Sequence, residues 1–421
     1  MAALERFLKY VKIDTQSDET THKTPSTEKQ KNLGKLLVEE LLELGLDDAQ
    51  MDKWGNVYAH LKGEKAERIG LNAHMDTALE TSGKNVKPRK ITEWDGSDIQ
   101  LDEEKVLSIN EFPALKNHIG KDLIVTDGKT LLGADDKAGI AIIMGVLEFF
   151  KEHPEVKHHP ISVCFTVDEE IGEGADHFDI KKMKADFAYT VDGAEINHVD
   201  FRNFNAQSVK IKFEGFAVHP GEGKNTLINA LMLMHEFIQS LPQNETPYDS
   251  DGDQGYWHLT EVSGNSVNCE CSMILREFEI DVLEKRDASL FAIRDALLTK
   301  YPKGKIEIEI TDQYQNMAEY LKKDPRPLFK AIESMKRLGL DPESKSIRGG
   351  TDGASFSKMG LVTPNLGTGS SNHLTFGAWD VEKRQTPSAD LVSNFLPLQV
   401  SVVCFLIALP SRAAAYCSRV R

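Results

Sequence analysis

The chain has 421 residues, of which 40% are hydrophobic and 28% are charged, a composition typical of a globular protein. Its 50 basic and 66 acidic side chains give a net charge of -16, which repels phosphate backbones and argues against nucleic acid as a partner. The longest apolar stretch, 396–409, is interrupted by polar residues and is shorter than the ~20 residues of a membrane-spanning helix. We therefore expect two domains and no membrane partner.

The cysteines are few, odd in number and without a pattern, which is typical of a reducing compartment. Near the N-terminus, Glu5 and Arg6 interrupt any apolar targeting segment. We therefore expect a cytoplasmic protein. The sequence does not fix the oligomeric state, and a homodimer is one option.

The first part of the chain alternates helices and strands. The expected elements are a helix that starts at Thr24 and Pro25 and ends at Gly45, a strand Ile69–Ala73, a helix Ala138–Lys151, and strands Ile161–Val167 and Phe187–Val191. This alternation favours an α/β domain with a mostly parallel sheet that is covered on both faces.

A different pattern begins near residue 205. The expected elements are strand Ser208–Phe213, helix Thr226–Leu241, strands Tyr256–Val262 and Cys269–Phe278, helix Leu283–Thr299, and strand Lys305–Thr311. This βαββαβ order predicts an inserted two-layer α+β domain over 205–315. Residues 1–204 and 316–421 then form the first domain.

Acidic residues and a histidine follow the predicted strands or open the long helix. They are His74 and Asp76, Asp135 and Asp136, Asp168 to Glu170, and Asp192. Ligands of open α/β sheets bind beyond the carboxyl ends of the strands, so these side chains are expected at one edge. Each group alone has an ordinary explanation as a strand end, a helix cap or a turn.

Together, these groups would crowd negative charges, and a pair of divalent cations resolves that repulsion. Imidazole and carboxylate ligands suit zinc, and cobalt or manganese could substitute for it. Two such metals activate a water for hydrolysis, which also needs a base to take the proton of that water. Within the pair Glu169 and Glu170, one carboxylate can bind metal while the other faces the water.

The motifs His74-Met75-Asp76, Gly133–Gly139, Asp168–Gly172 and Val191–Gly193 resemble those of the dinuclear-zinc exopeptidase family. Three further stretches, His219–Gly221, Ile347–Gly353 and Pro364–Leu366, are similar to the tripeptide aminopeptidases of that family. The match runs from the N-terminus to about Ser371. The resemblance implies a zinc-exopeptidase catalytic domain with an inserted lid domain, and release of the N-terminal residue from short peptides, above all tripeptides.

The resemblance also implies roles for single residues. The metal ligands would be His74, Asp135, Glu170, Asp192 and His373, with Asp135 bridging two zinc ions. Glu169 would be the general base, and Asp76 would orient the imidazole of His74. His219 would reach toward the substrate or the oxyanion, and Arg276 and Arg348 would hold the C-terminal carboxylate of the peptide. A plain loop histidine and surface salt bridges are the alternatives for these last three.

The sequence departs from the family at its end. Asn372 is followed at once by His373 with no intervening aromatic residue, and the chain beyond Trp379 resembles no charged final helix. We therefore expect one metal to bind weakly, and the apolar stretch 398–409 to promote aggregation. The alternative functions are a related zinc dipeptidase, a deacylase of N-acyl amino acids, and a binding protein without turnover.

Overall fold

The computed structural model describes residues 2–193, 195–371, 391–393 and 396–408. The chain forms two compact units. Unit 1 comprises Met1–Phe201, Glu319–Lys345 and Thr351–Arg421, and unit 2 comprises Arg202–Ala318 and Ser346–Gly350. Among the described residues, none of the helices combines the length and the apolar character that crossing a bilayer requires.

Unit 1 is built on a seven-stranded sheet. Its order is β1 (Gln50–Met51), β2 (Val57–Leu61), β8 (Ile161–Thr166), β3 (Ile69–His74), β9 (Phe187–Gly193), β17 (Asn365–Gly367) and β10 (Val199–Asp200). The four central strands, β8 to β17, are parallel, as expected. The outer pairings are antiparallel, and for β1 and β2 the reason is the tight turn that joins them. The predicted α/β fold is confirmed.

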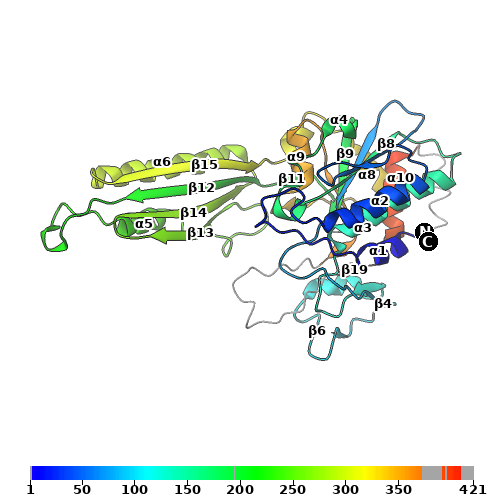
Figure 1. Ribbon diagram of the computed structural model, residues 1–421, viewed down its shortest axis with the longest axis horizontal. Coiled ribbons are helices and arrows are strands. Elements are labelled where there is room, and N and C mark those ends of the chain that lie inside the picture. Colours follow the sequence, from blue (N-terminus) through cyan, green and yellow to red (C-terminus); the bar gives the residue numbers. More distant parts are fainter. Residues whose placement is uncertain (1, 194, 372–390, 394–395, 409–421) are drawn as a thin grey trace. The chain divides into compact units, whose positions relative to one another are not determined.

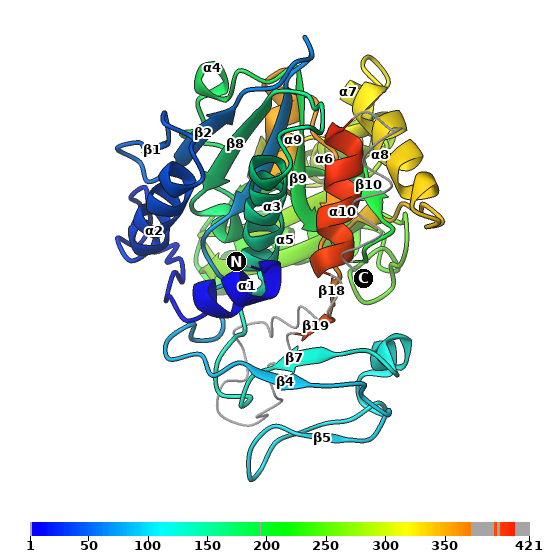
Figure 2. The same ribbon diagram turned by 90° about the vertical axis from the view of Figure 1, so that its right-hand side faces the viewer.

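Helices cover both faces of this sheet, as the sequence predicted. The larger core contains α1 (Ala3–Tyr10), α2 (Gln30–Glu43), α3 (Ala134–Glu152), α8 (Arg326–Arg337) and α10 (Leu396–Ile407). Figure 2 shows α1, α3 and α10 together on one side of the sheet. On the other face, a smaller core lies under α4 (Ile180–Met183) and α9 (Asp352–Lys358), where the rings of Phe178 and Phe356 stack at 3.9 Å.

The start of α2 differs from the prediction. The helix begins at Gln30, whereas Thr24 and Pro25 were expected to open it. Residues 24–29 form turns instead, because their polar groups bond outside the helix. The Ser26 backbone N–H, for example, donates to Asp168. Gly45 ends the helix with a φ of 89°, as expected of a glycine in the left-handed region.

The expectation that the apolar stretch 398–409 promotes aggregation stays a prediction, but the described part of this stretch packs against other helices. The helix α10 forms there and packs against α3 and α8. Val402, Val403, Leu406 and Ile407 are buried in the larger core. A helix that is apolar on most sides is stable when its neighbours offer apolar surface, and α3 and α8 do so.

The segment between β3 and α3 contains short elements that periodicity did not predict. They are β4 (Arg89–Ile91), β5 (Ile99–Gln100), β6 (Val106–Leu107), the 3-10 helix Pro113–His118, and β7 (Leu123–Val125). With β18 (Ser370–Ser371) and β19 (Leu391–Ser393), the strands β7 and β4 form a separate sheet. Trp94, Leu107 and Leu123 belong to its small core. Strands of two or three residues are too short to show an alternating pattern.

Unit 2 follows the predicted βαββαβ order. Its elements are β12 (Asn205–Glu214), α5 (Ala230–Gln239), β13 (Tyr256–Gly264), β14 (Asn268–Glu277), α6 (Ile280–Lys300) and β15 (Lys305–Tyr314). The strands form an antiparallel sheet in the order β13-β14-β12-β15, and α5 and α6 lie along it (Figure 1). Apolar side chains of alternate positions, such as Val209, Ile211 and Phe213, face the two helices in one core.

Three buried asparagines join the first and last strands of unit 2. Asn203 Oδ1 accepts from the Met317 backbone N–H at 2.7 Å, and Asn205 Oδ1 accepts from the Asn316 N–H at 2.9 Å. Asn316 Oδ1 in turn accepts from the Asn203 N–H at 3.2 Å. The short strand β16 (Ser346–Ile347) pairs in parallel with β11 (Arg202–Asn203), so a later part of the chain completes this unit.

Candidate metal centre and active site

The ends of neighbouring strands bring three of the predicted ligands together. His74 ends β3, Asp192 lies near the end of the adjacent parallel strand β9, and Asp135 lies at the start of α3. His74 Nε2 is 2.8 Å from Asp135 Oδ1 and 3.7 Å from Asp192 Oδ1. Ligand atoms of all three residues lie within 4.8 Å of one another, which makes them a candidate metal site.

Asp76 joins this site to the acidic pair that follows β8. The side chain is fully buried, and Oδ1 lies 3.3 Å from His74 Nδ1. The two oxygens of the same carboxylate accept the backbone N–H groups of Glu169 and Glu170, each at 3.1 Å. The Asp76 carboxylate therefore lies beside the imidazole and fixes the backbone of the acidic pair.

The two glutamates lie in a short 3-10 turn, Glu169–Ile171, directly after β8. Glu169 Oε2 is 3.9 Å from His74 Nε2, so its carboxyl group lies at the candidate metal site. Glu170 does not belong to the group formed by His74, Asp135 and Asp192. Burial raises the pKa of Glu170, and the negative charge of Asp135 raises it further. The turn thus places both glutamates within electrostatic reach of the same aspartate.

Several ionised carboxylates so close together in a partly buried site are unfavourable without a counter-charge. Burial raises the pKa of Glu169 to about 8, and it raises the pKa values of Glu170 and Asp192 well above their usual range. Burial alone would lower the pKa of His74, but Asp135 and Asp76 outweigh that effect and raise it. A divalent cation would favour the charged carboxylates and the neutral imidazole. The donor set therefore fits a metal.

Asp136 supports His74 from the other side. It is fully buried, and its carboxylate accepts the backbone N–H of His74 at 3.3 Å and that of Gly139 at 3.1 Å. Of the two adjacent aspartates, Asp135 is the one whose carboxylate reaches the imidazole of His74. The structure thus separates a site residue from a supporting one, a distinction that two neighbouring acids in a sequence do not reveal.

Asp352 is a residue of this region for which no role was predicted. Only 5% of it is exposed, and its Oδ2 accepts from Thr166 Oγ1 at 2.7 Å and from Asn72 Nδ2 at 3.5 Å. Burial raises its pKa to about 6. Asp352 lies in the Gly-rich motif Ile347–Gly353, which could have pointed to it as a site residue. That motif was used only as part of the resemblance to the family.

Asn365 explains the motif Pro364–Leu366 in the same way. Its Nδ2 donates to Thr351 Oγ1 at 3.0 Å, and its Oδ1 accepts from Thr190 Oγ1 at 2.5 Å. These bonds tie the segment that carries Asp352 to β9, the strand that carries Asp192. The motif Pro364–Leu366 therefore stabilises the position of the segments that carry Asp352 and Asp192 without contributing a side chain to the candidate metal site.

The residues predicted to bind substrate lie in unit 2. The guanidinium group of Arg348 donates to the carbonyls of Gly252 and Gln254 and to Ser250 Oγ, at 2.6 to 3.0 Å. Arg276 Nη1 donates to the Gln207 carbonyl at 3.2 Å. His219 is exposed, and its Nδ1 accepts the Gly221 N–H at 3.2 Å. His373 lies outside the described residues.

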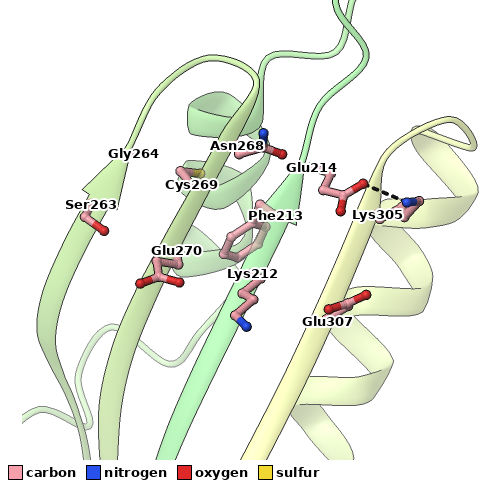
Figure 3. A pocket seen from close by; sticks show the side chains of 10 residues that line it. All are labelled: Lys212, Phe213, Glu214, Ser263, Gly264, Asn268, Cys269, Glu270, Lys305 and Glu307. Atoms are coloured by element: carbon pink, nitrogen blue, oxygen red, sulfur yellow. Dashed lines mark hydrogen bonds and ion pairs between the residues drawn. The ribbon is translucent and has the colours of Figure 1, made fainter.

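Unit 2 also has a hollow of about 480 Å³ near one end of its sheet (Figure 3). Lys212 on β12 lies across from Glu270 on β14 and from Glu307 on β15. At the same end of the sheet, Lys305 Nζ bonds to Glu214 Oε2 at 2.7 Å. Opposite charges on adjacent strands stabilise a sheet. The charged side chains that line this hollow are therefore explained by the stability of the sheet.

Comparisons with known proteins agree with this geometry. Residues 125–378 match the model of the peptidase family M20/M25/M40. Peptidase T of Clostridium perfringens strain SM101 is 46% identical over 371 residues, which cover 87% of this chain and 91% of that protein. Peptidase T of Desulfitobacterium hafniense strain Y51 is 47% identical over 377 residues, 88% of this chain and 92% of that protein.

Solved structures show the same fold. The aminopeptidase PepT of Bacillus cereus superposes with a TM-score of 0.72 at 19% identity, over 96% of this chain and 97% of that one. A tripeptidase of Staphylococcus aureus superposes with a TM-score of 0.71 at 22% identity, over 98% of both chains. The resemblance that the motifs predicted is thus confirmed, and this chain belongs to the peptidase family M20/M25/M40.

Proposed function

We propose that this protein is a metal-dependent aminopeptidase that releases the N-terminal residue from tripeptides. The observation that carries this proposal is the convergence of His74, Asp135 and Asp192 next to the carboxyl group of Glu169. Metal ligands beside a half-buried carboxyl group are what water-driven hydrolysis of an amide needs. The choice of tripeptides is supported by the relatives named peptidase T and by the Staphylococcus aureus tripeptidase.

The metals are proposed to be two zinc ions, with cobalt or manganese as substitutes. His74, Asp135, Glu170, Asp192 and His373 would hold them, with Asp135 between the two. When bound, such a pair polarises the peptide carbonyl and lowers the pKa of a water. Asp76 would keep the imidazole of His74 in the tautomer that leaves Nε2 free to coordinate.

Glu169 is proposed as the general base. Its carboxylate takes the proton of the attacking water and returns it to the amine of the departing peptide. The bond from the Glu169 N–H to Asp76 fixes the backbone from which that side chain extends.

For the substrate, Arg276 and Arg348 are proposed to bind the C-terminal carboxylate, and His219 to reach the substrate or the oxyanion. The hydrogen bonds of Arg348 to the 250–254 loop suggest an alternative role, in which this residue stabilises the conformation of the loop. Amidated tripeptides separate the two. A carboxylate role predicts that Arg348→Ala raises KM for free tripeptides more than for amidated ones, whereas a loop role predicts equal effects on both.

The proposed compartment is the cytoplasm. Cys164, Cys269 and Cys271 are free and buried, which supports a reducing environment. The net charge of -16 supports the absence of a nucleic-acid partner.

A substrate panel with the zinc-loaded protein tests the proposal. The panel contains tripeptides, their N-acetylated forms, dipeptides and N-acyl amino acids, and Glu169→Gln is the inactive control. We expect cleavage of the first bond of free tripeptides only. Turnover confined to dipeptides or to N-acyl amino acids would instead identify a dipeptidase or a deacylase, and an absence of turnover would leave a binding protein.

A further inference from the structure

Asp168 is a buried acid next to the candidate active site, and the proposed reaction does not use it. It is fully buried, and its carboxylate is held by Ser26 and Gln30. Ser26 donates its N–H at 2.7 Å and its Oγ at 2.5 Å, and Gln30 Nε2 donates at 2.5 Å. The pairing is reciprocal, because the Asp168 N–H donates to Gln30 Oε1 at 3.2 Å.

The backbone of Asp168 makes the turn that follows β8. Its φ is 60°, in the left-handed region that most side chains avoid and that aspartate tolerates better than most. The Asp168 carbonyl accepts the Glu173 N–H at 3.0 Å and closes the turn. Directly after it, the N–H groups of Glu169 and Glu170 point to Asp76.

We propose that Asp168 is a positioning residue for Glu169 and Glu170. Its bonds to Ser26 and Gln30 hold the left-handed turn, and this turn sets the direction in which the next two residues leave the sheet. The acidic pair is then fixed from two sides, through Asp168 on one and through Asp76 on the other. The catalytic consequence rests on the proposed function, but the effect on the backbone does not.

The chain offers a matched control in Asp179. This residue follows the same loop, and its carboxylate accepts the backbone N–H groups of Lys181 and Lys182 at the start of α4. Asp179→Asn removes the charge of a backbone-binding carboxylate, as Asp168→Asn does, but not at the acidic pair. Asp179→Asn therefore shows what the loss of such a charge does away from the acidic pair.

The experiment compares Asp168→Asn, Asp179→Asn and the double variant D168N/Q30E at saturating zinc. An amide at 168 faces donors with only one acceptor oxygen, so we expect kcat to fall about 10- to 100-fold while KM stays within about twofold. In the double variant the amide and the carboxylate exchange places, so we expect most of kcat to return. Asp179→Asn should keep kcat.

Hydrogen exchange gives a second readout, independent of activity, in the metal-free protein. The amides of Glu169 and Glu170 should exchange at least tenfold faster in Asp168→Asn and unchanged in Asp179→Asn. If Asp168→Asn does not fold, Ser26→Ala replaces it as the test variant. Ser26→Ala removes only the Oγ donor, so the exchange of the same two amides should become faster by a smaller factor. Normal exchange in the folded variants, together with normal kcat, would overturn the proposal. A wild-type protein that cuts no tripeptide would refute the proposed function, and the exchange data would still decide the role of Asp168.

Discussion

Asp76 Oδ1 accepts the backbone N–H of Glu169 at 3.1 Å, so the proposed base is fixed by a residue that also contacts a proposed metal ligand. One buried carboxylate thereby sets both the imidazole of His74 and the acidic pair. The proposed metal binding and the proposed proton transfer would then both depend on the Asp76 side chain.

Asp76→Asn should therefore damage two properties at once. An amide has one acceptor oxygen, and its nitrogen would face a backbone N–H that needs an acceptor. We expect kcat and zinc affinity each to fall about 10- to 100-fold. Kinetics at saturating zinc and a zinc titration measure the two losses, with Asp179→Asn as the control. Unchanged kcat in the zinc-saturated variant would contradict this account.

Glu169→Gln and Glu170→Gln should separate the base from the ligand. The first variant loses the proton acceptor, so we expect kcat to fall at least ~100-fold while zinc stays bound. The second should lose bound zinc as well as activity. Metal analysis after gel filtration, next to initial rates, distinguishes them. Near-normal kcat in Glu169→Gln would show that the roles within the pair are wrong.

Metal content tests the proposed stoichiometry. Zinc-reconstituted protein should carry close to two ions per chain, and a chelator should abolish activity in a way that zinc restores. His373→Ala should weaken one of the two ions, because a neutral imidazole is lost from its ligands. Since the local sequence around His373 departs from the family, we also expect this ion to be the weaker one in the wild type. Two equally tight ions in His373→Ala would exclude it as a ligand.

The pH dependence of stability should differ between metal-free and zinc-loaded protein. Burial raises the pKa of Glu169 to about 8, and Asp135 and Asp76 raise the pKa of His74. The folded chain thus holds protons that the unfolded chain releases, and the free energy of unfolding falls as pH rises from about 5 to 8. Bound metal replaces those protons. Zinc should therefore raise the Tm more at pH ~8 than at pH ~5.5. An equal increase in Tm at both pH values would contradict the raised pKa values of Glu169 and His74.

The helix α10 should be necessary for a stable unit 1. Leu406 is 4% exposed in the larger core, whereas Leu42 is 45% exposed on α2. We expect Leu406→Ala to lower the free energy of unfolding by about 2–5 kcal/mol and Leu42→Ala to have little effect. Denaturant unfolding of the two variants measures both. Similar small losses would mean that the helix adds little to the core.

Much of the fold could be predicted because the apolar residues of its strands and helices follow clear patterns. The strands β3, β8 and β9 are buried apolar runs that end in polar residues, and the prediction located all three. The start of α2 could not be predicted, since Ser26 bonds to Asp168, far away in the sequence. The path of α10 depended on apolar partners in α3 and α8, which its own sequence does not reveal.

The candidate site divides in the same way. His74, Asp135 and Asp192 were predictable because the ends of strands and the start of a helix meet at one edge. Asp168 was expected at this edge too, but its contact with Ser26, like that of Asp352 with Thr166, joins residues far apart in the sequence and could not be predicted. A local pattern reveals which groups carry chemistry, but long-range hydrogen bonds decide which groups hold them in place.

The pairing of β11 with β16 restricts how this protein can be divided or recombined. A gene fragment that encodes 202–318 contains every strand of the four-stranded sheet, yet it omits Ser346–Gly350. Without that stretch, the Phe204 N–H loses its bond to the Ile347 carbonyl, and the 250–254 loop loses the guanidinium group of Arg348. A domain graft between two relatives must therefore carry both pieces from the same parent.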